Sequence, residues 1–199
     1  MSTKNQTIHA ILSKASVGIA GVGGLGSNAA IALARSGVGR LVIVDFDVVE
    51  EKNLNRQYFF LRQVGAFKVD ALQENIRLVN PAVKVDIHNA RLEQGSMDVF
   101  FHDVDVIIEA LDDAETKAQF VEEILLKLPD VPLVAASGVA GYGHCERIEL
   151  HRIGKLSMLY DGQAKSSDED VLLGPRVGVL ANWEADLVLE ILLGEHDDH

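Results

Sequence analysis

Glycine, aspartate and two basic residues in the first third of the chain form the pattern with the clearest chemical use. Residues 21–26 read GVGGLG, and they separate an apolar run at 17–20 from a small-residue segment typical of a helix. A second apolar run, 41–44, follows and ends on Asp45. A strand, a glycine turn, a helix and a second strand that ends on an acidic residue are the parts of a nucleotide-binding βαβ unit. This stretch therefore predicts a phosphate-binding turn.

The glycines of this turn have distinct predicted uses. Gly21 and Gly23 allow a tight turn and a close approach of the backbone to phosphate, and Gly26 lets the helix pack closely on the strand. The free N–H groups and the dipole of the helix face the anion. Asp45 is placed to accept hydrogen bonds from ribose hydroxyls. The nucleotide-binding residues predicted from this unit are Gly21, Gly23, Gly24, Gly26, Asp45 and Asp47.

Two basic residues after the second strand, Arg56 and Lys68, favour a triphosphate over a dinucleotide. Both come from the edge of the sheet that carries the glycine turn, where ligands bind in folds of this kind. Backbone N–H groups largely neutralise a dinucleotide pyrophosphate, whereas a triphosphate that loses pyrophosphate needs added cations. Taken alone, a residue such as Arg56 or Lys68 is as often a solvated surface charge as a phosphate ligand. Because both follow the glycine turn, both are predicted to bind phosphate. Asn53 is predicted to order this loop or to bind the nucleotide.

The segments GVGGLGSN and DFDVVEEKNLNRQ, together with Lys68, resemble the ThiF/MoeB/HesA family, relatives of the ubiquitin-activating enzymes. Members of that family use ATP to adenylate the C-terminal glycine of a small ubiquitin-like carrier. The resemblance covers about residues 16–194. The short length, the LDDAETK stretch and the late GPRV segment most resemble the compact ThiF type of thiamine biosynthesis. The resemblance implies a ThiS-like sulfur carrier ending in Gly-Gly as the partner, and a homodimer.

A second group of polar residues follows the apolar run 104–110, which is predicted to be a buried parallel strand. Asp112 lies just beyond it, at the edge with the ligand crevice, and a carboxylate there suits Mg²⁺. The resemblance implies that Asp112 is the metal-binding aspartate. Asp113 is the weaker candidate, because it is also a good N-cap for a helix predicted over 115–128. Lys117, in the first turn of that helix, is predicted either to touch phosphate or to lie in solvent.

Adenylation of a carboxylate by ATP needs no general base, because the nucleophile is already ionised at pH 7. The obstacle is repulsion between the carboxylate and the polyanion, so the predicted catalytic groups are Arg56, Lys68 and an Mg²⁺ held by Asp112. An NAD-dependent oxidoreductase would explain the glycines and Asp45 but leaves both cations unused. A non-catalytic adaptor that keeps the nucleotide-binding fold is a further alternative.

Composition limits the classes of function. The chain has 199 residues, of which 48% are hydrophobic, and its net charge is −12. One α/β domain is expected over 1–199, and the negative charge argues against nucleic acid, tRNA included, as the main partner. No apolar run is long enough to span a membrane, and the first residues lack the features of a signal peptide, so we expect a cytoplasmic protein. The single cysteine, Cys145, excludes the four-cysteine zinc site of many relatives, so no zinc is expected.

Cys145 is interpreted as incidental, because the neighbouring Glu146 disfavours a thiolate. The predicted fold is a Rossmann-like, mostly parallel sheet with helices on both faces and antiparallel edge strands near the C-terminus. Residues 161–173 are predicted to be either a mobile crossover loop that acts as a lid or a plain disordered loop. The other predicted elements are helices at 1–15, 62–79, 95–102, 115–128 and 174–193, strands at 83–87, 104–110 and 132–136, and antiparallel strands within 145–160.

Overall fold

A seven-stranded sheet organises the protein, for which a computed structural model describes residues 3–164 and 170–194. The helices are α1 (Lys4–Leu12), α2 (Gly24–Ser36), α3 (Lys68–Val79), α4 (Ala114–Lys127) and α5 (Gly174–Leu193). The strands are β1 (Ser16–Ala20), β2 (Arg40–Asp45), β3 (Lys84–Asn89), β4 (Val106–Glu109), β5 (Leu133–Ser137), β6 (Glu149–Ile153) and β7 (Leu156–Tyr160). Three short 3₁₀ turns are η1 (Glu51–Asn53), η2 (Leu61–Gln63) and η3 (Cys145–Arg147).

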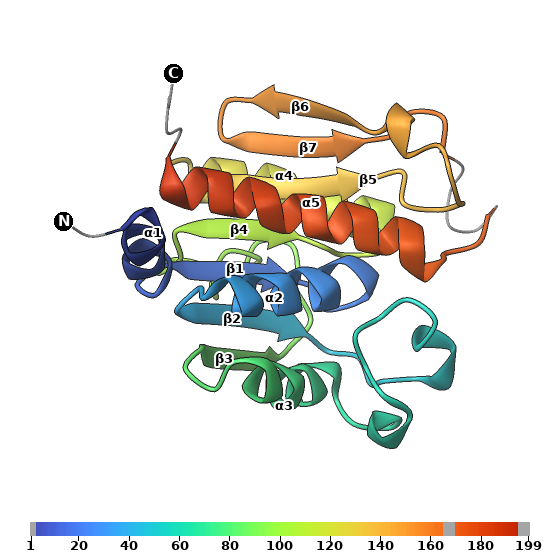
Figure 1. The fold of residues 1–199 in the computed structure, drawn as a ribbon. Coiled ribbons are helices and arrows are strands. Elements are labelled where there is room, and N and C mark those ends of the chain that lie inside the picture. The colour runs from blue at the N-terminus through green and yellow to red at the C-terminus, as the bar shows by residue number, and fades with distance from the viewer. Residues whose placement is uncertain (1–2, 165–169, 195–199) are drawn as a thin grey trace.

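The strand order is β3-β2-β1-β4-β5-β7-β6, and every neighbouring pair is parallel except β6 with β7 (Figure 1). The strands β1, β2, β4 and β5 are nearly continuous apolar runs because helices cover both of their faces. The predicted fold class, with an antiparallel strand at the C-terminal edge, is confirmed.

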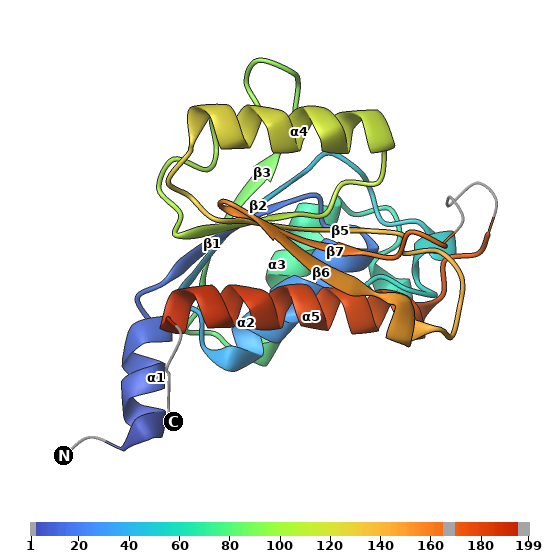
Figure 2. The same ribbon diagram turned by 90° about the horizontal axis from the view of Figure 1, so that it is seen from above.

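Helices form a layer on each face of this sheet. Figure 2 shows α4 alone on one face and α1, α2, α3 and α5 on the other. Two clusters of buried apolar side chains fill the spaces between the layers: one includes Leu33, Ile76 and Leu180, and the other includes Phe101, Phe120 and Ile124. These clusters hold the strand ends in place, so the loops at those ends start from fixed positions.

The carboxyl ends of the parallel strands point to the right in Figure 1. The glycine turn, the long connection between β2 and α3, the loop after β4 and the beginning of α5 all lie on that side. Ligands of open α/β sheets bind at this edge because the loops there leave a crevice. The fold therefore brings the predicted site residues to one edge.

Most predicted elements agree with the structure to within two residues, but three helices do not. The helix expected over 1–15 is the shorter α1, Lys4–Leu12. The helix expected over 62–79 begins only at Lys68, because the chain first forms η2 and then a turn at Gly65, whose φ is +89°. The helix expected over 95–102 is a series of turns. Gly95 has a φ of +93°, and the N–H groups of Val99 and Phe101 donate to carbonyls only three residues earlier, so the bonds of a regular α-helix do not form. Glu123 on α4 accepts the N–H groups of Gly95 and Met97 and holds these turns in place.

Two further expectations concern the C-terminal third. Cys145 was expected within a strand, but it is exposed in η3, directly after His144, whose φ is +51°. The crossover loop expected at 161–173 includes residues 165–169, which lie outside the described residues. In its described part, Gly141 donates a backbone hydrogen bond to Val171. None of the helices within 3–164 and 170–194 is long and apolar enough to cross a membrane.

Candidate nucleotide-binding site

The glycine turn is packed so closely that its first and last glycines have no room for a side chain. Gly21 has a φ of +86°, and its N–H donates to the carbonyl of Val44 at 2.9 Å. A Cβ added at Gly21 would lie 2.7 Å from the carbonyl oxygen of Ala110, and one added at Gly26 would collide with the carbonyl of Gly21. The turn is therefore held between the ends of β2 and β4, which supports the sequence-based roles of these two glycines.

The outer side of the turn is open and polar. Gly23 is the N-cap of α2 and supplies no side-chain cap, so the first amide groups of α2 remain available to an anion. A Cβ added at Gly23 would find only Nε2 of Gln57, at 3.6 Å. Gln57 is 9% exposed, and its buried Oε1 has no hydrogen-bond partner in the described part of the chain. The uncapped helix start and the Nε2 donor of Gln57 can bind phosphate oxygens, whereas Oε1 is an acceptor and needs a donor such as a hydroxyl group.

Asp45 links the glycine turn to the connection that follows β2. Its Oδ2 accepts the N–H of Val22 and its Oδ1 accepts the N–H of Asp47, both at 2.8 Å. Each carboxylate oxygen has further acceptor capacity, so these bonds are compatible with a ribose contact. The ribose contact itself stays a prediction.

Lys68 is a buried cation and not a solvated one. Its side chain is 7% exposed, and its Nζ lies 2.7 Å from Oδ2 of Asp47. Lys68 is also the first residue of α3, and its backbone N–H donates to the carbonyl of Asp47 at 2.9 Å. The cation is therefore fixed in place before any ligand binds, next to the aspartate that Asp45 positions.

Arg56 lies against the start of α2. Its Cγ is 3.8 Å from the position that a Cβ on Gly24 would take. Its Nη1 donates to the carbonyl of Lys52 at 3.1 Å and to Oδ1 of Asn55 at 2.9 Å. The side chain is partly exposed, so the guanidinium retains donors that face solvent.

Two asparagines order the loop that carries Arg56. Asn53 is 5% exposed, accepts the N–H of Glu50 through Oδ1 at 3.0 Å, and accepts the N–H of Arg56 through its carbonyl. This arrangement agrees with the loop-ordering role predicted for Asn53. Asn28 joins the two parts of the site, because its Nδ2 donates to the carbonyls of Gly24 and Arg56 at 2.7 and 2.9 Å.

The two aspartates after β4 differ in their contacts. Asp113 caps α4: its Oδ2 accepts the backbone N–H and the hydroxyl of Thr116, each at 2.7 Å, and these bonds lower the pKa of Asp113. Asp112 is exposed, and within the described ranges its side chain makes no hydrogen bond or ion pair. The capping role of Asp113 is confirmed, and Asp112 is left as the carboxylate available to a metal.

No group of three His, Cys, Asp or Glu side chains that could hold a metal ion occurs among the described residues. A magnesium ion at Asp112 would therefore take its other ligands from phosphate and water, as Mg²⁺ does in many nucleotide sites. The residues present fit such an ion, and the ion itself stays a proposal.

A surface hollow of about 430 Å³ lies at the opposite, amino edge of the sheet. Its lining comes from α1 and from the segments that precede β2 and β3, and it contains none of the predicted site residues. The N-terminus of α2, where a phosphate would bind, faces the other way.

Lys117 does not lie free in solvent. Its Nζ is 2.9 Å from Oε1 and 2.8 Å from Oε2 of Glu109, a residue of β4 that is 0% exposed. The expectation that Lys117 lies free in solvent is therefore wrong, and its contact with phosphate stays a prediction. In the sequence, the charged residue Glu109 inside an otherwise apolar strand could have indicated a buried ion pair.

A second buried ion pair lies near the beginning of α5. Nη2 of Arg176 is 2.6 Å from Oδ2 of Asp161 and 3.0 Å from the carbonyl of Gly138, and Nη1 donates to the carbonyl of Gly143 at 2.8 Å. The two side chains are 3% and 4% exposed. The pair ties α5 to β7 and to the loop after β5. Sequence reasoning missed it, as it missed the contacts of Gln57 and Asn28.

Glu184 is a buried carboxyl on α5 without a partner. It is 0% exposed, and neither of its oxygens has a hydrogen-bond partner in the described part of the chain. Burial raises the pKa of Glu184 well above its ordinary value of 4.5; the positive charge of Lys117 opposes this shift and the negative charge of Glu109 adds to it.

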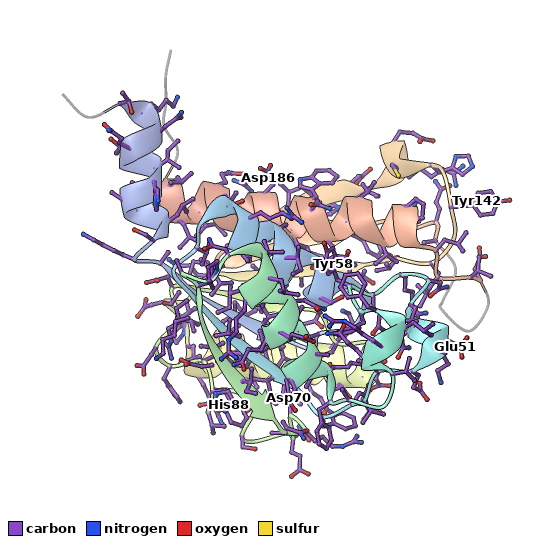
Figure 3. All side chains as sticks on the ribbon, turned by 60° about the horizontal axis from the view of Figure 1, so that its bottom comes forward. Glu51, Tyr58, Asp70, His88, Tyr142 and Asp186 are labelled. Atoms are coloured by element: carbon purple, nitrogen blue, oxygen red, sulfur yellow. The ribbon has the colours of Figure 1, made fainter. Side chains whose placement is uncertain are left out.

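Replacing Glu184 with Gln is expected to remove a decline of stability with pH. Because the folded-state pKa is raised, the stability that this group contributes is complete below about pH 4.5 and is lost as pH rises toward the folded-state value. The loss amounts to about 1.4 kcal/mol per pH unit. Urea denaturation of wild type and Glu184→Gln at several pH values measures it. Asp186→Asn is the control, because Asp186 points away from the sheet on the same helix (Figure 3). A decline of equal slope in Glu184→Gln would contradict this assignment.

Comparison with known proteins identifies the fold. The profile of the ThiF family matches residues 6–199. The chain belongs to the ThiF family. It is 37% identical over 146 residues to the tRNA threonylcarbamoyladenosine dehydratase of Bacillus subtilis, covering 72% of this chain and 57% of that protein. It is 29% identical over 190 residues to the adenylyltransferase and sulfurtransferase MOCS3 of Caenorhabditis briggsae, covering 90% of this chain and 46% of that protein.

Among solved structures, the E. coli tRNA N6-threonylcarbamoyladenosine dehydratase in complex with ATP superposes with a TM-score of 0.85. It is 22% identical, and the match covers 94% of this chain and 89% of that one, so it shows the fold. The chain spans about half the length of the curated relatives it matches. The expected ThiF/MoeB/HesA resemblance is confirmed, and this ThiF-family chain has the ATP-binding adenylyltransferase fold.

Proposed function

We propose that this ThiF-family protein is an ATP-dependent adenylyltransferase that activates the C-terminal glycine carboxylate of a ThiS-like ubiquitin-fold sulfur carrier, in thiamine biosynthesis. One observation carries the proposal: a buried cation, Lys68, is fixed at the edge of the sheet that holds an uncapped helix start, and Arg56 lies against that helix start. Fixed positive charge around a phosphate site is what transfer of an adenylyl group requires. A dinucleotide oxidoreductase has no use for these cations.

In this reaction the carrier carboxylate attacks the α-phosphorus of ATP, an acyl-phosphate bond forms, and pyrophosphate leaves. The first amides of α2 bind phosphate oxygens, and Lys68 and Arg56 offset charge on the leaving pyrophosphate. Asp45 holds the turn in the conformation that presents those amides. A magnesium ion bound by Asp112 would further neutralise phosphate charge. No proton transfer is needed, because the attacking carboxylate is ionised at pH 7.

The choice of partner rests on charge and on the relatives. One relative is named as an adenylyltransferase and sulfurtransferase, which supports a sulfur carrier. A tRNA substrate is the second candidate, because the 37% identical relative is named as a dehydratase of a tRNA nucleoside. A net charge of −12 disfavours a polyanion, so we place the carrier first.

A homodimer and a cytoplasmic location are part of the same proposal. Support for the dimer comes from large apolar side chains that remain exposed on the segment from β2 to the start of α3. They are Phe46, Val48, Phe60, Leu61, Val64 and Phe67. Exposed apolar clusters of this kind mark contact surfaces in many proteins.

Exchange of labelled pyrophosphate into ATP tests the proposal. The protein, ATP and Mg²⁺ are incubated with a ThiS-like carrier ending in Gly-Gly, with the same carrier lacking its last glycine, and with tRNA. We expect exchange only with the intact carrier. Exchange with the truncated carrier would contradict activation of the terminal glycine. Exchange with tRNA alone would favour the second candidate, and ATP binding without exchange in any arm would favour the non-catalytic adaptor.

A further inference from the structure

Leu111, the residue just before Asp112, is held at both of its backbone polar groups by one buried ion pair. The N–H of Leu111 donates to Oε1 of Glu109 at 2.8 Å, and the carbonyl of Leu111 accepts from Nζ of Lys117 at 3.0 Å. The same Nζ lies 2.9 and 2.8 Å from the two carboxylate oxygens of Glu109. Lys117 and Glu109 therefore form a closed clamp on the backbone of Leu111.

Stability alone gives little reason for this clamp. Glu109 is 0% exposed and the Lys117 side chain 18%, so both charges lose most of their hydration. An apolar pair of similar volume would join α4 to β4 as well or better, since the desolvation penalty of a buried ion pair often equals its electrostatic attraction. What an apolar pair cannot do is hydrogen-bond the N–H and carbonyl of Leu111. The distinctive effect of the ion pair is thus on the loop.

The loop matters because Asp112 has nothing else to hold it. Its side chain is exposed and makes no hydrogen bond or ion pair within the described residues, so the position of its carboxylate follows from its backbone. On its other side, Asp113 fixes the start of α4 through Thr116. Leu111 and Asp113 are therefore both anchored, and Asp112 lies between two fixed points.

We propose that Lys117 and Glu109 are positioning residues, which hold the backbone of Leu111 so that the Asp112 carboxylate faces the metal–nucleotide complex. The inference rests on the proposed function only in assigning a metal to Asp112. It adds that the strength of metal binding depends on two residues that act through the backbone of Leu111. Groups that orient a metal ligand typically change metal affinity by about 10- to 100-fold when they are removed.

A matched control lies on the same helix. Lys127, in the last turn of α4, has the same kind of partners: Asp98 at 2.7 Å, Glu123 at 2.9 Å and the carbonyl of Gly95 at 2.6 Å. It clamps the turn near residue 95, not the loop that carries Asp112. Lys127→Met therefore removes a comparable ion-pair network from α4 and leaves the Asp112 loop untouched.

Nucleotide affinity with and without metal tests the clamp. Calorimetric titration with a non-hydrolysable ATP analogue, in EDTA and in Mg²⁺, gives the factor by which Mg²⁺ tightens binding. We expect Lys117→Met to reduce this factor by roughly 10- to 100-fold while affinity in EDTA stays near the wild-type value. Lys127→Met should keep the wild-type factor. Lys117→Arg should restore most of it, because a guanidinium can still bind both Glu109 and the Leu111 carbonyl.

Amide hydrogen exchange gives a readout that does not involve nucleotide. Exchange at Leu111 and Asp112 should become faster in Lys117→Met and stay unchanged in Lys127→Met. If Lys117→Met does not fold, Glu109→Gln carries the same test, because it weakens the bond to Lys117 while keeping an acceptor for the Leu111 N–H. Equal behaviour of the Lys117 and Lys127 variants in both measurements would overturn the inference.

The outcomes separate this inference from the proposed function. A wild-type protein whose nucleotide affinity does not respond to Mg²⁺ would overturn the metal role of Asp112 and the clamp together. A normal Mg²⁺ response that survives in Lys117→Met would overturn the clamp alone. Failure of pyrophosphate exchange would contradict the proposed carrier and leave the binding result standing, because the titration contains no carrier.

Discussion

Lys68→Met is expected to lower the rate of carrier-dependent pyrophosphate exchange by roughly 100- to 1000-fold, or about 2.7–4 kcal/mol in activation free energy. The side chain is 7% exposed and its Nζ is held 2.7 Å from Asp47, so the positive charge is fixed and poorly hydrated. A charge placed in this way stabilises a developing anion without reorganising water. We expect the loss mainly in kcat, because the charge on pyrophosphate grows in the transition state.

Two comparisons decide whether this loss reflects phosphate binding or only the broken ion pair. Lys52→Met removes an exposed lysine from the same connection, 74% exposed and paired with Glu50, and should leave the rate unchanged. The double variant Lys68→Met/Asp47→Asn removes the whole ion pair. If Lys68 only neutralises Asp47, the double variant will recover activity; if Lys68 acts on phosphate, it will stay as inactive as Lys68→Met. Recovery would contradict the role assigned here.

Arg176→Met is expected to lower the free energy of unfolding by about 3–5 kcal/mol, since it leaves Asp161 as an unpaired buried charge. The ion-pair distance is 2.6 Å and both side chains are nearly inaccessible. The substitution also removes the donors to Gly138 and Gly143, which hold the loop after β5. Such a loss is a large share of the roughly 5–15 kcal/mol that stabilises a typical protein. Urea denaturation monitored by circular dichroism measures it.

Arg152→Met is the matched control for this prediction. Arg152 makes two short bonds to Glu190, at 2.6 and 2.8 Å, but the two side chains are 46% and 40% exposed. An exposed pair is worth about 0–1 kcal/mol, so the control should be nearly as stable as wild type. Equal losses in Arg152→Met and Arg176→Met would show that burial does not determine the effect.

The ion pair of Asp161 and Arg176 predicts that the stability of the fold depends on pH in the acidic range. Burial alone raises the pKa of Asp161, but the Gln163 amide and the Arg176 guanidinium outweigh it and lower the pKa below its ordinary value of 3.8. Because the pKa of Asp161 is lower in the folded state, its ionised carboxylate stabilises the protein at pH values above the unfolded-state pKa. This stabilisation is lost as pH falls through the folded-state pKa. Arg176→Met should therefore lose less stability on acidification than wild type.

The sequence by itself determined the features that depend on near neighbours. The spacing of Gly21, Gly23 and Gly26 predicted the turn, because the positive φ of Gly21 and the close approach of Gly26 to the Gly21 carbonyl are local requirements that only glycine meets. Asp113 was recognised as a cap from its position before α4, since a cap bonds three residues ahead. Apolar runs predicted the buried strands because strands covered on both faces need no alternation.

Only the tertiary structure decided which charges meet. Asp47 and Lys68 are 21 residues apart in the chain, and Asp161 and Arg176 are 15 apart; their pairing follows from how the strand ends converge. The expected helix over 95–102 is replaced by turns that Glu123 on a distant helix holds in place, a contact that the sequence pattern does not reveal. Pattern shows which side chains can carry charge, but solvent exposure and partners are properties of the packed fold. That is why the bonds of Lys117 to Glu109 and to the backbone beside Asp112 could not be predicted from the sequence.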